Sequence, residues 1–165
     1  MPTIGRPKIV TRPEQPYMGI RTIAPFKGMF KVVESLRKEM NAWVDEHSLT
    51  QSGPPFLRYH VIDMRGSMDI EFSFPFRKAL PNDGNVKAGI LPAGRYASLI
   101  FSGGGISGNR ALIEWVRAQG LEFDRWDTSQ GDNFRGRYET YLTDPKIEPR
   151  KSKWQIEVAI KLADQ

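Results

Sequence analysis

Cysteine is absent from this chain of 165 residues, and histidine occurs only as His47 and His60. Without cysteine there can be no disulfide and no thiolate metal ligand, and two histidines are too few for the usual protein-built zinc sites. We therefore expect no metal site and no cofactor. What remains is an ordinary globular composition, 39% hydrophobic and 26% charged, long enough to bury one substantial core.

Long hydrophobic runs are also missing. No stretch is long enough to span a bilayer. The opening residues MPTIGRPKIV lack the basic region followed by an apolar run that marks a secretory signal. We therefore expect a soluble, cytoplasmic protein with no membrane partner.

Positive charge is in modest excess, with 24 Lys and Arg against 19 Asp and Glu. A basic chain can indicate a nucleic-acid partner. Here the basic residues are scattered, and only PRKSK at 149–153 is locally dense. No helix-turn-helix, zinc-finger or RNA-binding signature accompanies that segment. We interpret it as a solvated turn and expect no direct nucleic-acid binding.

Two amphipathic helices are predicted from apolar residues at three- and four-residue spacing. The first runs from Met29 to about His47 and the second over 107–120. For the second helix, Ser107 is the expected cap and Gly120 the expected terminator. The apolar positions are Phe30, Val33, Leu36, Met40, Trp43 and Val44 in the first helix, and Leu112, Trp115 and Val116 in the second.

Strands are predicted on both sides of each helix. Residues 8–23 contain two prolines, which indicate a bent or edge strand. The segments 56–64 and 68–76 form an antiparallel hairpin with one covered face, because apolar and polar residues alternate strictly in the second of them. The segment 154–162 alternates in the same way, and the polar stretch 127–136 is expected to be a loop.

The order strand, helix, strand, strand occurs twice, over 8–79 and over 85–163. The closing strands can be superimposed with Glu71 over Glu157, so we infer an internal duplication within a single domain of residues 1–165. Each half is too small to cover a sheet by itself. The predicted fold is therefore α+β, with two helices packed on a combined antiparallel sheet and a groove between the halves.

One carboxylate occupies an unusual place in this pattern. In RYETYLTDP at 137–145, alternation places Arg137, Glu139 and Tyr141 on the same face of a strand. We expect Glu71 and Glu157 to share that surface or the seam between the halves. Two interpretations without a ligand-binding role stay open. Arg137 could form a same-face ion pair with Glu139, and Glu157 could be solvated or paired with a lysine.

Several segments resemble the GyrI-like small-molecule-binding domain in order and spacing, over roughly residues 8–163. This family includes the effector-binding modules of multidrug-sensing bacterial transcription activators, the DNA gyrase inhibitory protein and many stand-alone proteins. The most specific element is ExYLTDP, in which one residue separates the acid from YLTDP, ahead of a Trp-led terminal strand. The matching segments are GPPFLRY at 53–59, DIEFSFPF at 69–76, LPAGRYASL at 91–99, YETYLTDP at 138–145 and KWQIEVAIKL at 153–162.

The resemblance implies a binding role for Glu139, because in multidrug-sensing members the acid before YLTDP meets cationic lipophilic ligands in an aromatic pocket. In water-poor surroundings a bare carboxylate is disfavoured, so it takes up a proton or binds a cation. The expected ligand is an amphipathic, cationic or flat aromatic small molecule. Tyr59 and Tyr141 are the expected aromatic walls. The full candidate ligand-binding set is Glu139, Tyr141, Tyr59, Glu71, Phe56 and Trp126.

Two alternative functions also follow from the resemblance. Some stand-alone relatives are hydrolases that open strained rings of DNA-alkylating natural products, which would make Glu139 a general acid or base. Other members bind a protein such as DNA gyrase, so a protein partner is the second alternative. The sequence contains no separate nucleophile, and binding is therefore placed ahead of hydrolysis.

Overall fold

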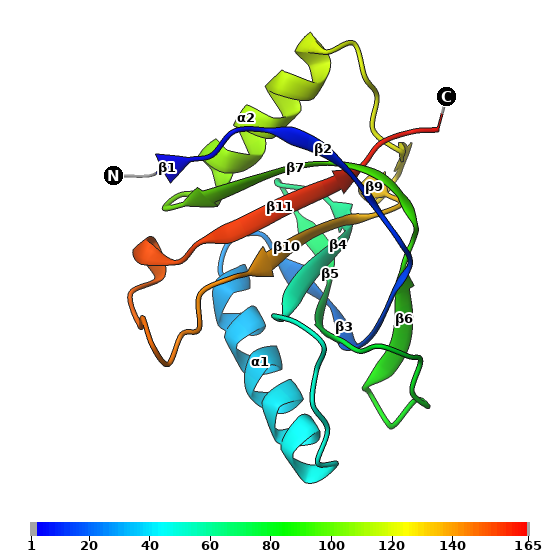
Figure 1. Cartoon of the computed structure of the whole chain (residues 1–165), viewed down its shortest axis with the longest axis vertical. Coiled ribbons are helices and arrows are strands. Elements are labelled where there is room, and N and C mark those ends of the chain that lie inside the picture. Colours follow the sequence, from blue (N-terminus) through cyan, green and yellow to red (C-terminus); the bar gives the residue numbers. More distant parts are fainter. Residues whose placement is uncertain (1–2, 165) are drawn as a thin grey trace.

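Two helices pack against a large antiparallel sheet in the computed structural model, which describes residues 3–164 (Figure 1). This confirms the predicted α+β class. The helical elements are α1 (Met29–Glu46), α2 (Gly105–Ala118) and the short 3-10 helix η1 (Lys151–Lys153). The strands are β1 (Thr3–Ile4), β2 (Lys8–Arg12), β3 (Gln15–Pro25), β4 (Phe56–Ile62), β5 (Ser67–Pro75), β6 (Lys87–Leu91), β7 (Gly94–Ser102), β8 (Arg125–Thr128), β9 (Gly131–Phe134), β10 (Arg137–Tyr141) and β11 (Ile156–Lys161).

The first helix matches its prediction, whereas the second begins earlier than expected. Gly104 is its N-cap residue, so Ser107 lies inside the helix and caps nothing. Gly108 lets the start of this helix pack closely on β7, because a Cβ there would lie 2.5 Å from Cγ of Phe101. At the other end, Gly120 has φ +70° and terminates the helix as predicted.

The sheet is built from two halves with the same internal strand order. One half reads β7-β11-β10 and the other β3-β5-β4, and the halves meet where β10 pairs with β4. The seam strand β4 directly follows α1, whereas β10 follows α2 only after the β8–β9 pair. A common origin of the two halves stays a prediction.

Each half also contributes one strand to the other half. β2 pairs with β7, and β6 pairs with β3. The pairs run in one continuous register, from Lys8 opposite Ser98 to Gly19 opposite Lys87. Pro13 and Pro92 lie at the bend between the two sections, which confirms the prediction of a bent strand at 8–23. We call this arrangement the reciprocal ladder.

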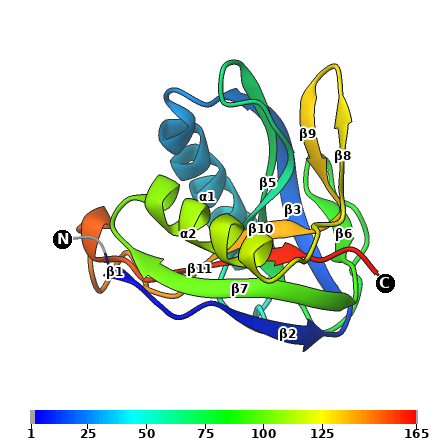
Figure 2. The same cartoon turned by 90° about the horizontal axis from the view of Figure 1, so that it is seen from above.

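Both faces of the sheet are covered, contrary to the prediction of one covered face for β5. On the first face α1 packs on β3 and β5, and α2 packs on β7 (Figure 2). On the second face Glu71 and Ser73 are also buried. The reason is that the reciprocal ladder links the two ends of the sheet, so the sheet curls around its second face. A smaller cluster fills that face: Tyr17, Phe56, Leu91, Tyr96, Tyr138 and Ala159.

The predicted loop at 127–136 is instead part of a β-hairpin. Strands β8 and β9 pair with each other, and β9 continues onto the end of β4. These strands were not predicted because their composition is polar. The side chains of β8 are exposed, including Trp126 at 41%, so they show no alternation of apolar and polar residues. Among residues 3–164, neither α-helix is apolar enough over a sufficient length to cross a membrane.

Candidate functional site

Glu139 lies at the seam between the two halves, on the face that carries the helices. Its neighbours across the sheet are Leu57 of β4 and Val158 of β11, and both belong to the helix-side cores. Tyr138 points to the opposite face, as the alternation predicted. Glu139 is only 9% exposed, so its carboxylate is largely removed from water.

Two neutral groups hold the Glu139 carboxylate. The Tyr59 hydroxyl donates to Oε1 at 2.6 Å, and Asn109 Nδ2 donates to Oε2 at 2.9 Å. Burial, together with the negative charge of Glu139, raises the pKa of Tyr59 well above its ordinary value, so the phenol stays a donor. An ionised carboxylate has about four acceptor positions. Two of them are used here, and neither donor carries a charge.

Arg137 does not pair directly with Glu139. Arg137 Nη2 donates to Asn109 Oδ1 at 2.6 Å, and the Asn109 amide therefore stands between the two charges. Asn109 Nδ2 also donates to the Gly105 carbonyl, which fixes the orientation of the amide. Burial lowers the pKa of Arg137, opposed by the charge of Glu139. The guanidinium lies 4.6 Å from the centre of the Phe134 ring.

Three aromatic rings beside Glu139 surround the guanidinium of Arg37. We call these rings, Phe72, Tyr141 and Trp154, the aromatic cage. The Arg37 Cζ atom lies 5.7, 5.2 and 5.3 Å from their respective centres. Arg37 is 8% exposed, and its Nε and Nη2 atoms are buried without a hydrogen-bond partner. Its nearest carboxylate oxygen, on Glu34, is 3.4 Å away.

A second cation of the chain lies at the rim of this cage. Lys151 Nζ is 3.6 Å from the centre of the Phe30 ring, and that ring is 6.4 Å from the ring of Trp154. Burial lowers the pKa of Lys151, opposed by the charges of Glu34 and Glu139. The region between the helices is thus an aromatic, partly acidic site whose ring faces are occupied by the chain's own cations.

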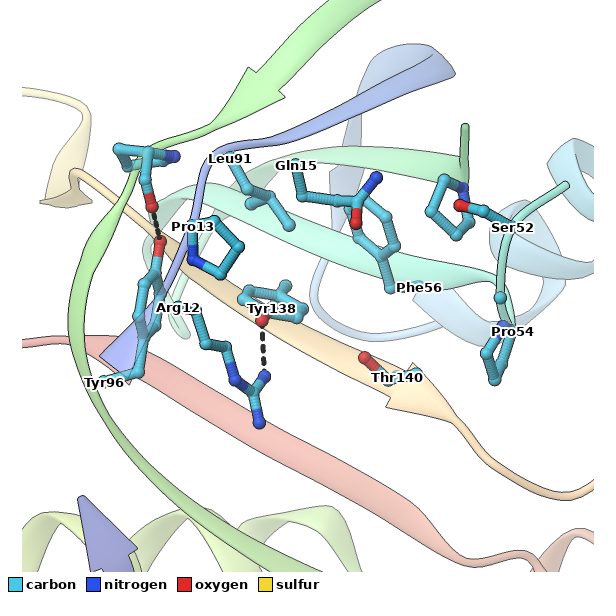
Figure 3. A pocket seen from close by; sticks show the side chains of 13 residues that line it. Arg12, Pro13, Gln15, Ser52, Pro54, Phe56, Leu91, Tyr96, Tyr138 and Thr140 are labelled. Carbon is cyan, nitrogen blue, oxygen red and sulfur yellow. Dashed lines mark hydrogen bonds between the residues drawn. The ribbon is translucent and has the colours of Figure 1, made fainter. Parts of the chain in front are cut away.

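The structure brings together only part of the predicted site. Tyr59 and Tyr141 lie with Glu139, whereas Phe56, Glu71 and Trp126 do not. Phe56 points to the opposite face of the sheet and lines a cavity of about 250 Å³ (Figure 3). The other residues that line this cavity include Arg12, Leu91, Tyr138 and Thr140 (Figure 3).

Glu71 and Glu157 also face away from Glu139, so the acids do not share one surface. Arg12 Nη2 donates a hydrogen bond to Glu157 Oε2 at 2.9 Å. The partner of Glu157 is therefore an arginine and not a lysine. Glu71 accepts a hydrogen bond from Tyr17 at 2.7 Å, and His60 Nε2 lies 2.9 Å from the same oxygen. Burial alone raises the pKa of Glu71, but these two contacts, together with the charge of Arg58, outweigh it and lower the pKa.

This lowered pKa predicts how Glu71 contributes to stability. A carboxyl group whose folded-state pKa is depressed stabilises the fold above its unfolded pKa and loses that contribution as the pH falls through the folded value. We expect Glu71→Gln to lower the free energy of unfolding by about 2 kcal/mol at pH 7. The difference from wild type should shrink below the ordinary value of 4.5. Urea titrations of both proteins at pH 7 and pH 3 measure it, and a pH-independent difference would contradict the assignment.

Arg37 and Asn109 were not among the predicted site residues, although the sequence contains a signal for both. Arg37 is four residues after Val33, and Asn109 is three before Leu112, so each lies on the buried stripe of its helix. A charged or amide side chain that interrupts such a stripe indicates a buried polar contact. Trp154, which precedes β11, lies in one of the helix-side cores and is also a wall of the aromatic cage.

Comparison with known proteins gives a family and a set of similar folds. The sequence profile of the GyrI-like small molecule binding domain matches residues 6–163. No curated protein sequence matches the chain. Among solved structures, the C-terminal domain of EcmrR is 18% identical with a TM-score of 0.68, covering 98% of this chain and 99% of that one. EcmrR bound to DNA is 21% identical with a TM-score of 0.71, over 97% of this chain. The chain spans 58% of that longer EcmrR chain.

Two further structures share the fold. A hydrolase from Listeria innocua is 14% identical with a TM-score of 0.62, over 96% of this chain and 92% of the other. SAV2435 bound to tetraphenylphosphonium is 9% identical with a TM-score of 0.57, over 96% and 94%. At these identities the structures establish the fold alone, whereas the profile match extends over nearly all residues. The chain therefore belongs to the family of GyrI-like small molecule binding domains.

Proposed function

We propose that this protein binds planar, lipophilic organic cations in the aromatic cage beside Glu139. The observation that carries the proposal is the place of Arg37. A flat cation already lies against three aromatic rings there; its Nε and Nη2 atoms lack hydrogen-bond partners, and only Nη2 has an ion pair, with Glu34 at 3.4 Å. The tetraphenylphosphonium complex of the similar protein SAV2435 agrees with a lipophilic cation as ligand.

Exchange of Arg37 for such a ligand is favourable on physical grounds. Each buried donor without a partner costs about 1–3 kcal/mol. A lipophilic cation has few donors to remove from water, yet each of its contacts with a ring face contributes about 0.5–2 kcal/mol. Arg37 already pairs with Glu34, which is partly exposed, so the displaced guanidinium can keep this ion pair closer to solvent.

Glu139 supplies the electrostatic part of the proposed site. It is two residues from Tyr141 on the same face of β10, and its negative charge contributes, after burial, to the raised pKa of Tyr141. Its present donors are neutral, so the net negative charge is not cancelled by a direct ion pair. Preference should therefore follow positive charge and flatness more than detailed shape.

A pair of isosteric ligands tests this function. N-methylacridinium and N-methylacridone have nearly the same planar shape and differ in charge. Titration followed by fluorescence and calorimetry should show binding of the cation with at least tenfold higher affinity than of the neutral compound. Equal affinities, or no binding of either compound at millimolar concentration, would refute a charge-selective cage.

Hydrolysis by Glu139 and binding of a protein such as DNA gyrase stay predictions from the family resemblance. Hydrolysis requires turnover, so a strained electrophilic substrate should gain the mass of one water in the presence of the protein. Inhibition of gyrase supercoiling that persists in variants of the aromatic cage would instead favour a protein partner.

A further inference from the structure

A second cavity, of about 180 Å³, lies on the side of the sheet opposite the helices, beneath the β8–β9 hairpin. Its chemistry is opposite to that of the aromatic cage, because its lining includes three arginines and no carboxylate-bearing residue. The polar and aromatic residues that line it are Arg21, Arg58, His60, Trp126, Asn133 and Arg135. They come from β3, β4, the hairpin and the turn that follows it.

The three arginines differ in how their charges are balanced. Arg21 forms a two-point ion pair with Asp69, at 2.8 and 2.9 Å. Arg135 Nε lies 3.8 Å from Asp124, a carboxylate that also pairs with Lys161 at 3.1 Å. Arg135 is therefore only weakly compensated.

Arg58 has no carboxylate within 4.0 Å in the part of the chain that the structure describes. Its guanidinium donates to the Tyr17 hydroxyl at 2.8 Å and to the carbonyl oxygens of Ile90 and Arg135 at 3.1 and 3.0 Å. Its Nε atom is buried without a partner. The Tyr17 hydroxyl in turn donates to Glu71, and the charge of Arg58 helps to lower the pKa of that carboxyl. Arg58 is therefore balanced across the Tyr17 hydroxyl and not by a direct ion pair.

The hairpin adds a flat apolar wall to this basic cavity. Trp126 is 41% exposed and has Asn133 as its partner on β9. The guanidinium of Arg135 lies 4.7 Å from the centre of the Trp126 ring, so a charge and an aromatic face meet at one point. A ligand that satisfies both features carries a negative group for the arginines and a planar body for the indole.

We propose that this cavity binds a small aromatic carboxylate, at a site separate from the aromatic cage. Arginine offers a planar fork of donors that matches a carboxylate. Of the three arginines, Arg58 and Arg135 have positive charges that are least compensated by a direct ion pair. The ring of the ligand lies along Trp126, and the volume accommodates a compound of one ring. This site does not depend on the proposed cation binding, since the residues of the two sites lie on opposite faces of the sheet.

Benzoate is the probe, and benzamide, which has the same shape without charge, is its control. We expect benzoate to shift the indole NH signal of Trp126 in an NMR titration, with the other three tryptophans unaffected. Its affinity should exceed that of benzamide at least tenfold in 0.15 M salt. Equal affinities, a shift confined to the other tryptophans, or inorganic phosphate binding as tightly as benzoate would each overturn the assignment.

Substitutions locate the site. Arg58→Gln should weaken benzoate binding at least tenfold. Arg135→Gln and Trp126→Ala change exposed side chains that the fold does not need. Each of these two substitutions should weaken benzoate binding at least threefold. Arg150→Gln removes the same charge from an exposed pair with Glu148 and should leave the affinity unchanged. If Arg58→Gln fails to fold, the two exposed variants decide the question. Wild-type affinity in both of them, or an equal loss in Arg150→Gln, would contradict the proposal.

Discussion

Glu139→Gln is expected to weaken binding of N-methylacridinium by about tenfold to a hundredfold, which corresponds to about 1.4–2.7 kcal/mol. Two opposite charges about 4 Å apart attract by about 4 kcal/mol at the effective dielectric constant of a protein, and desolvation removes part of this. The substitution removes the charge and retains the shape. Binding of the neutral N-methylacridone should stay unchanged, so the preference between the two ligands should nearly disappear.

The Glu139→Gln protein should fold, because its neighbours can accommodate an amide. The Tyr59 hydroxyl can accept a hydrogen bond where it now donates one, and Asn109 can continue to donate to the amide oxygen. Glu157→Gln is the matched control, since Glu157 pairs with Arg12 on the opposite face of the sheet. If both substitutions weaken binding equally, the effect arises from net charge, and a local role for Glu139 is wrong.

Arg37→Met is expected to have the opposite effect and to raise the affinity for N-methylacridinium at least tenfold. The guanidinium now occupies the ring faces that the ligand needs, and methionine can fill the space without competing for them electrostatically. The substitution removes buried donors without partners, and this gain offsets the loss of the three ring contacts and of the ion pair with Glu34. The free energy of unfolding should therefore stay within about 1 kcal/mol of wild type. Calorimetry and urea denaturation provide the two measurements.

Lys38→Met is the control for this experiment. Lys38 is the next residue on α1 and is exposed, so its replacement removes one positive charge from the same helix without opening the aromatic cage. Its effect on affinity should be below threefold. A lower affinity in Arg37→Met would show that Arg37 contacts the ligand directly, and would exclude the exchange of one cation for another.

Regular patterns in the sequence predicted the architecture well. Apolar spacing located α1, and alternation placed Ile70 and Phe72 in one core and Val158 and Ile160 in the other. The β8–β9 hairpin was not predictable in this way, because its strands are short and expose most of their side chains. The burial of Glu71 on the second face was also missed, since it depends on the pairing of distant segments that leave no local periodicity.

The candidate site was only partly predictable for a related reason. Alternation within one strand placed Glu139 and Tyr141 together correctly. It did not show that Phe56 and Trp126 lie away from Glu139. Which side chains face Glu139 depends on how distant strands pair, and alternation within one strand does not determine that register. The contact between Arg37 and the aromatic cage joins α1 to β5, β10 and the segment before β11, and no short-range pattern encodes it.

The reciprocal ladder determines how a ligand can be accommodated. Because β2 completes the sheet of the second half and β6 that of the first, the halves are tied at two places besides their seam. A hinge that opened between them would have to break the backbone pairing of β2 with β7 or of β6 with β3. We therefore expect the proposed ligand to reach Glu139 by side-chain rotation and by small shifts of α1 and the η1 segment over a rigid frame. A chain cut within residues 80–85 should accordingly yield two fragments that assemble with each other and that do not fold separately.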